Sequence, residues 1–85
     1  MKLNARTASL IAVGASVTAN CQPCLEINGA RAARYGAEPL EIAEAVEIGR
    51  TVRAGAAAKL DAFAAGLGAA DAAARPAEAA CGCGS

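Results

Sequence analysis

The sequence contains no histidine and no tryptophan, and its aromatic residues are one tyrosine and one phenylalanine. The absence of histidine removes the side chain that most often serves as a base near neutral pH, which limits the catalytic chemistry open to the chain. Net charge is absent too, because eight basic residues balance eight acidic ones. We therefore expect neither nucleic acid nor an anionic membrane as a partner. No apolar run approaches the roughly 20 residues of a membrane span.

Large apolar side chains are scarce as well. Hydrophobic residues make up 55% of the 85 positions, but 26 positions are alanine. Burial is worth roughly 25 cal/mol per Å² of apolar surface, and a chain this short buries only about 60–65% of its surface on folding. The composition therefore predicts one small domain with a thin core and a marginally stable protomer. Because alanine and glycine faces let helices approach closely, we expect a homo-oligomer that pools its apolar faces.

Four cysteines in a short chain would suit a secreted disulfide framework, so the N-terminus decides the expected compartment. Residues 1–19 loosely resemble a signal peptide with a cleavage site after Ala19. Polar residues such as Ser9 and Ser16 interrupt its apolar run, however, and we expect a cytoplasmic protein. Thiols are kept reduced in that compartment, where paired cysteines are more often catalytic, redox-active or metal-binding than structural.

Apolar spacing and turn residues predict an all-α fold. Asn20 either closes the first helix in a left-handed conformation or caps the second, and Pro23 suits the first turn of that second helix. Gly36 is the expected stop of the second helix, Pro39 opens the third, and Gly55 is expected to kink or break the chain. The expected helices span residues 7–19, 21–35, 39–53 and 56–67.

The last two of these helices are expected to bury apolar stripes. The stripe of the third helix comprises Leu40, Ile42, Ala43, Val46, Gly49 and Val52, and its opposite, charged face comprises Glu41, Glu44, Glu47 and Arg50. The fourth helix should bury Leu60, Phe63 and Leu67.

The composition changes after Gly68. Residues 69–80 are almost all alanine and carry no large apolar side chain that could offset the entropy of ordering them. We therefore divide the chain into a helical domain, residues 1–68, and a flexible alanine-rich tail, residues 69–85. The tail ends in Cys81-Gly82-Cys83-Gly84-Ser85, where the glycines are expected to leave two thiols exposed.

The stretch Cys21-Gln22-Pro23-Cys24 is the main candidate for chemistry. At the start of a helix a thiolate meets unpaired N–H groups at the positive end of the helix dipole, which lowers a thiol pKa. Cys21 is therefore the expected nucleophile. Cys24, three residues on, is placed to attack a mixed disulfide or a sulfenic acid at Cys21 and to close the ring.

Two stretches resemble a known family: Ile11 to Glu26, where small residues lead into the two cysteines, and Glu41 to Val46. They are similar to the carboxymuconolactone decarboxylase-like domain, and within it to the alkylhydroperoxidase D-like branch with its C-x-x-C motif. The resemblance covers about residues 8–68. It implies an all-helical fold that assembles as dimers, trimers or hexamers, with the cysteine pair facing a subunit contact.

The sequence departs from that family at its proton relay. Peroxidase members carry a histidine four residues after the second cysteine and a glutamate twelve residues before the first, and these positions here hold Asn28 and Ser9. Neither an amide nor a serine hydroxyl accepts a proton near neutral pH, so peroxidase activity is expected to be weak. Glu26 and Arg31 are the nearest charged residues in the sequence, and we expect both to be solvated.

The tail cysteines leave three interpretations open. In the first, Cys81 or Cys83 relays electrons to the Cys21–Cys24 disulfide. In the second, the two tail thiols complete a site with the reduced thiols of Cys21 and Cys24, which would hold a soft ion such as Zn²⁺, Cu(I) or a trivalent arsenical. In the third, the tail is inert. The C-x-C spacing lacks the two- to four-residue loop that is usual in structural zinc sites.

The leading hypothesis is a thiol–disulfide oxidoreductase, or a weak alkylhydroperoxidase-like enzyme, with Cys21 and Cys24 as catalytic residues and no cofactor. Cys81, Cys83 and Asn28 are auxiliary candidates, and a thiol or disulfide electron donor would be the partner. The first alternative is a soft-metal or metalloid-binding protein that uses all four thiols. The second is a non-catalytic module that serves only assembly.

Overall fold

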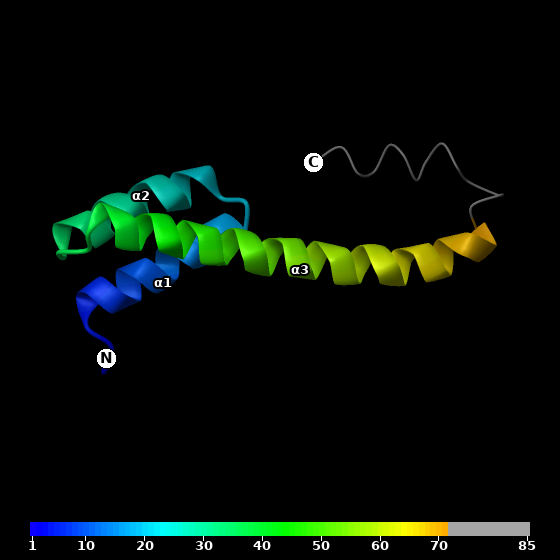
Figure 1. Ribbon diagram of the computed structural model, residues 1–85, viewed down its shortest axis with the longest axis horizontal. Helices are drawn as coiled ribbons and strands as arrows, with labels where there is room; N and C mark the ends of the chain where they lie inside the picture. Colours follow the sequence, from blue (N-terminus) through cyan, green and yellow to red (C-terminus); the bar gives the residue numbers. More distant parts are fainter. Residues whose placement is uncertain (72–85) are drawn as a thin grey trace. The chain divides into compact units, whose positions relative to one another are not determined.

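The computed structural model describes residues 1–71, and the side chains of residues 1–67. Three helices make up this part of the chain: α1 (Ala5–Thr18), α2 (Gln22–Arg34) and α3 (Pro39–Asp71). There is no strand among residues 1–71, which confirms the predicted all-α class. Residues Met1–Gly55 form one compact unit, which holds α1, α2 and the first half of α3 (Figure 1), and residues from Ala56 on belong to a second unit. The tail predicted from residue 69 lies almost wholly outside the described residues.

Helix α1 begins two residues earlier than the sequence pattern indicated. Asn4 is its N-cap, and the Asn4 side chain accepts a hydrogen bond from the Thr7 N–H at 2.7 Å. An asparagine in this position satisfies one of the N–H groups that a helix start leaves without a partner. The cap lies before the apolar repeat, and a prediction based on that repeat therefore placed the start too late.

Helices α1 and α2 both end in a Schellman motif. In α1, Asn20 adopts a left-handed φ of 59°, and the Cys21 N–H donates to the Ser16 carbonyl at 3.0 Å. In α2, Gly36 has a φ of 95°, and the Ala37 N–H donates to the Ala32 carbonyl at 2.9 Å. Both stops were predicted. For Asn20 the structure selects the left-handed alternative over the capping one.

Helix α3 runs without a break through Gly55, so the predicted third and fourth helices are one helix. The expected break at Gly55 is wrong. Glycine costs about 1 kcal/mol relative to alanine inside a helix, and three alanines follow Gly55 directly to favour the helical state. A side chain at Gly55 would meet nothing within 4 Å, so no packing contact forces the helix to end there.

The core of Met1–Gly55 is small. Its buried apolar side chains are Val13, Val17, Ala32, Ala37 and Ala45. The half-buried side chains that pack against this core are Leu10, Leu25, Ile42 and Val46. Val13 alone is a large side chain with no exposure at all. Alanine thus supplies three of the five buried apolar side chains of this unit, which agrees with the thin core that the composition predicts.

Helices α1 and α3 touch through glycines. A Cβ atom on Gly49 would collide with the carbonyl oxygen of Gly14 and lie 2.9 Å from Cβ of Val17. The Thr18 hydroxyl lies at this contact, 3.0 Å from the Gly14 carbonyl oxygen and 3.1 Å from that of Gly49. The absence of a side chain at Gly49 is thus what allows the two backbones to meet.

This contact sets which face of α3 is buried. Ala45 and Gly49 are buried and Ile42 and Val46 are half-buried, whereas Leu40, Ala43 and Val52 are exposed. The predicted stripe is correct at Ile42, Val46 and Gly49 and wrong at the other three positions. The physical reason is that the smallest residues, and not the largest, face α1. The predicted charged face is mostly solvated, because Glu44, Glu47 and Arg50 are exposed.

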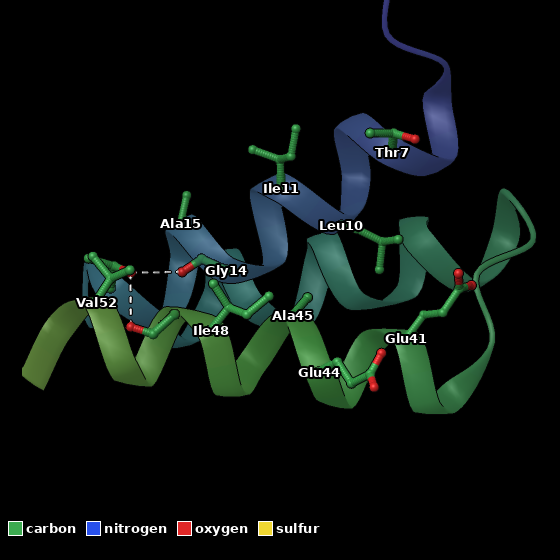
Figure 2. Close-up of a pocket in the computed structure, with 12 residues that line it drawn as sticks. Thr7, Leu10, Ile11, Gly14, Ala15, Glu41, Glu44, Ala45, Ile48 and Val52 are labelled. Atoms are coloured by element: carbon green, nitrogen blue, oxygen red, sulfur yellow. Dashed lines mark hydrogen bonds between the residues drawn. The ribbon is translucent and has the colours of Figure 1, made fainter.

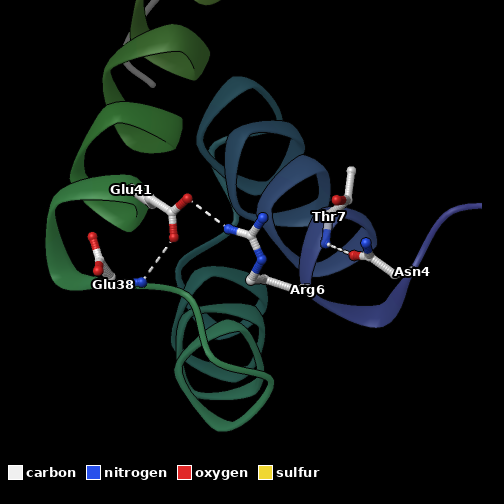
Figure 3. A network of polar contacts seen from close by, with 5 residues as sticks. All are labelled: Asn4, Arg6, Thr7, Glu38 and Glu41. Atoms are coloured by element: carbon white, nitrogen blue, oxygen red, sulfur yellow. Dashed lines mark hydrogen bonds and ion pairs between the residues drawn. The ribbon is translucent and has the colours of Figure 1, made fainter.

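A polar contact joins the two helices at their other end. Arg6 of α1 forms an ion pair with Glu41 of α3, and the second Glu41 oxygen accepts from the Glu38 N–H at 2.9 Å (Figure 3). The Glu38 N–H and then the Arg6 guanidinium hold the pKa of the Glu41 carboxyl below its usual value. Both charged side chains are more than a third exposed, so water screens the pair.

In the second unit, Leu60, Phe63 and Leu67 are exposed, between 58% and 66%. The prediction that they are buried is wrong for the single chain. Among the helices described here, none is both long and apolar enough to cross a bilayer. The predicted domain boundary at residue 68 stays a prediction.

The glycine contact predicts opposite effects for two glycine substitutions in α3. Gly49→Ala is expected to destabilise the folded chain by about 1–3 kcal/mol, because the added methyl group forces the two backbones apart. Gly55→Ala is the matched control and should stabilise by up to about 1 kcal/mol, since it removes a helix penalty and meets open space. Urea unfolding followed by circular dichroism measures both. Equal stabilities for the two variants would contradict the contact.

The depressed pKa of Glu41 predicts how stability depends on pH. The carboxylate contributes stability above the pKa of the unfolded chain, and that contribution is lost as pH falls through the lower, folded pKa. From about pH 5 to about pH 3, wild type should therefore lose more stability than Glu41→Gln. Glu44→Gln, an exposed carboxylate one turn along the same helix, should follow wild type. Parallel pH curves for wild type and Glu41→Gln would contradict the proposed linkage.

Candidate functional site

Cys21 and Cys24 are joined by a disulfide at the start of α2. Cys21 is the N-cap of the helix, and its sulfur accepts a hydrogen bond from the Cys24 N–H at 3.2 Å. Both cysteines are half-buried. Pro23 occupies the first turn, where the N–H that proline lacks would have no partner within the helix. The second helix thus starts one residue after Cys21, as a sulfur-capped helix.

The charges around this helix start favour a thiolate when the disulfide is reduced. The first turn of α2 contains no acidic residue, and its N–H groups, including that of Cys24 which donates to the Cys21 sulfur, lie at the positive end of the helix dipole. A thiolate in such a place is stabilised relative to the thiol and is the form that attacks disulfides. The sulfur that caps the helix, that of Cys21, is the one best placed to benefit.

Ser9 and Asn28 stand at the two positions where the resemblance predicts a proton relay, and they line the same hollow. Ser9 is 4% exposed, and Ser9 and Asn28 both line a hollow of about 430 Å³ between α1 and α2. The Asn28 amide donates to the Ser16 hydroxyl at 3.2 Å, and that hydroxyl donates to the Ala12 carbonyl at 2.6 Å. Asn28 therefore links α2 to α1, and neither Asn28 nor Ser9 supplies a group that accepts a proton near neutral pH.

The other sequence-derived candidates are placed as follows. Glu26 and Arg31 are exposed, as expected for solvated residues, and Arg31 also lines the hollow beside Asn28. Cys81 and Cys83 lie outside the described residues. Within residues 1–71 no group of three or more metal-ligating side chains comes together, so a four-thiol site would depend on those two cysteines.

Arg53 contacts Asn20, the residue before Cys21, and sequence reasoning missed this contact. Its Nη1 atom donates to the Asn20 side-chain oxygen at 3.0 Å and to the Val17 carbonyl at 3.2 Å. Arg53 and Asn20 are 33 residues apart in the sequence. No local pattern in the sequence signals a contact over that distance.

A second, larger hollow lies between α1 and α3 and holds neither Cys21 nor Cys24. It has a volume of about 510 Å³, and its lining includes Ile11, Ile48 and Val52, whose side chains are more than half exposed (Figure 2). Glu41 and Glu44 lie at one end of it. Most of the remaining lining is apolar.

The sequence model of the Carboxymuconolactone decarboxylase family matches residues 1–82. The chain belongs to the carboxymuconolactone decarboxylase family. The match is wider than the expected span of residues 8–68 and includes Cys81, while Cys83 falls just beyond it. No match was found among curated proteins or among solved structures. Membership in the family, the helical fold and the paired Cys21 and Cys24 are compatible with redox chemistry.

Proposed function

We propose that this member of the carboxymuconolactone decarboxylase family is a thiol–disulfide oxidoreductase that works through Cys21 and Cys24. The observation that carries the proposal is the disulfide at the start of α2, with the Cys21 sulfur as the helix cap. The geometry joins a stabilised attacking thiolate to a second thiol that can close the ring within one helical turn.

The proposed reaction reduces a disulfide in the substrate. The Cys21 thiolate attacks one sulfur of that disulfide, forms a mixed disulfide and releases the other sulfur as a thiolate, which takes a proton from water. Cys24, as a thiolate, then attacks the Cys21 sulfur and releases the second substrate thiol. The substrate gains two electrons and the Cys21–Cys24 pair loses two. A dithiol donor returns them by the reverse exchange.

Reduction of a hydroperoxide is proposed as a slower, secondary activity. The Cys21 thiolate would attack the peroxide, giving a sulfenic acid and an alcohol, and Cys24 would then form the disulfide with loss of water. The departing alkoxide needs a proton, and general acid assistance typically contributes 10²–10⁴-fold. Asn28 and Ser9 stand where the family's relay would be and do not supply that assistance, which supports disulfide exchange as the main reaction.

The protein is further proposed to act as a homo-oligomer in the cytoplasm, without a cofactor. The small core and the exposed side chains Ile11, Ile48 and Val52 along the hollow between α1 and α3 support self-association. Monomers rarely keep an apolar area of this kind uncovered unless it is a contact site. The four-thiol metal site gains no support from the described residues.

Substitution of each cysteine tests the proposed reaction. Cys21→Ser should abolish thiol-dependent reduction of a small disulfide such as oxidised glutathione, because the nucleophile is lost. Cys24→Ser should still attack and should accumulate a mixed disulfide, visible by mass spectrometry. Exchange that survives in Cys21→Ser would contradict the assignment. Loss of exchange only on replacing Cys81 and Cys83 would move the chemistry to the tail, and stoichiometric metal in native mass spectra of reduced protein would favour the metal-binding alternative.

A charged substitution in the apolar hollow tests self-association. Ile48→Glu should weaken the oligomer at least tenfold, measured by analytical ultracentrifugation over a concentration series, because it places a carboxylate in the contact. Ile27→Glu is the control: Ile27 is similarly exposed, on α2 and away from the hollow, and should have no effect. A monomeric wild type, or equal weakening by both variants, would contradict this surface as the interface.

A further inference from the structure

Arg53 joins three parts of the Met1–Gly55 unit at one point. It projects from α3, about one turn beyond Gly49, and its Nη1 atom donates both to the Val17 carbonyl near the end of α1 and to the side chain of Asn20. Arg53 is half-buried, whereas its neighbour Arg50 is exposed and pairs only with Glu47 at 3.8 Å. Two arginines one turn apart on the same helix therefore have different surroundings.

The residue that Arg53 holds is the one that presents Cys21. Asn20 is the only residue other than glycine with a positive φ in the described part of the chain, a conformation that costs of order 1 kcal/mol unless contacts support it. Its left-handed turn ends α1 and lets the Cys21 N–H bond back to Ser16. The direction in which the chain leaves this turn decides where the Cys21 sulfur caps α2.

We infer that Arg53 is a positioning residue for the Cys21–Cys24 pair, an inference that rests on the proposed oxidoreductase function. By binding the Asn20 side chain it fixes the turn that delivers Cys21 to the start of α2. It also keeps a permanent positive charge beside the residue before Cys21, where it favours the thiolate, and hence the reduced pair, over the neutral disulfide. Arg53 itself takes no part in the bond changes.

The test is the equilibrium of the full-length protein with reduced and oxidised glutathione at constant pH. Trypsin releases residues 7–31 as one peptide that contains both Cys21 and Cys24, so mass spectrometry reads the disulfide fraction of this pair apart from the tail cysteines. Arg53→Gln should shift the equilibrium about tenfold toward the disulfide, which corresponds to about 30 mV for a two-electron couple. Arg53→Lys, which keeps the charge and one donor, should restore most of the shift. Arg50→Gln is the matched control and should equal wild type.

A glycine at position 20 tells positioning from general damage to the fold. Asn20→Gly accepts the left-handed turn without strain and removes the oxygen that Arg53 binds. In that background the Asn20 oxygen no longer holds the guanidinium charge beside Cys21, so Arg53→Gln should shift the equilibrium less than threefold. A full tenfold shift there, or Arg53→Gln behaving like Arg50→Gln, overturns the inference. Failure of the wild-type pair to exchange with glutathione at all would instead overturn the proposed function beneath it.

Discussion

The structure depends on the backbone contact between Gly14 of α1 and Gly49 of α3. A helix pair held by large side chains would keep its axes 8–10 Å apart, whereas here no side chain at Gly49 stands between the helices. The Thr18 hydroxyl lies between the two glycine carbonyls at this point. Among the described side chains, Val13 is the only large one that is fully buried. Close approach of the two backbones therefore provides packing contacts that large side chains would otherwise make.

The same contact places the candidate site. Arg53 follows Gly49 by about one turn, so close packing of α3 on α1 brings its guanidinium to the last carbonyls of α1 and to Asn20. If larger residues held the helices farther apart, the Arg53 guanidinium would no longer reach Asn20. The turn before Cys21 would then lose that hydrogen bond. The packing of small residues therefore also determines the geometry of the turn that leads into the cysteine pair.

The parts of the fold that sequence predicts well are those with a local physical cause. Asn20 and Gly36 supply left-handed residues, and Pro39 starts a helix, each through its own backbone preference. The other predictions were wrong where a residue distant in the sequence, or a small difference in free energy, determined the structure. Gly55 carries a penalty too small to end a helix. The buried face of α3 centres on Ala45 and Gly49 and leaves Leu40 and Val52 exposed, and Arg53 meets Asn20 across 33 residues. Cys21 and Cys24 were found because their spacing is itself the signal.

Local closure of the disulfide suits the redox chemistry proposed for this thin fold. Cys21 and Cys24 are three residues apart, so the bond forms and breaks within the first turn of α2 and closes no long loop of the chain. The stabilising effect of a disulfide through the unfolded state grows with the length of the loop it closes, and for this one it is small. The proposed alternation between dithiol and disulfide would therefore leave the contact between α1 and α3 in place. The proposed exchange at the helix start would thus leave intact the packing that holds Cys21 in place.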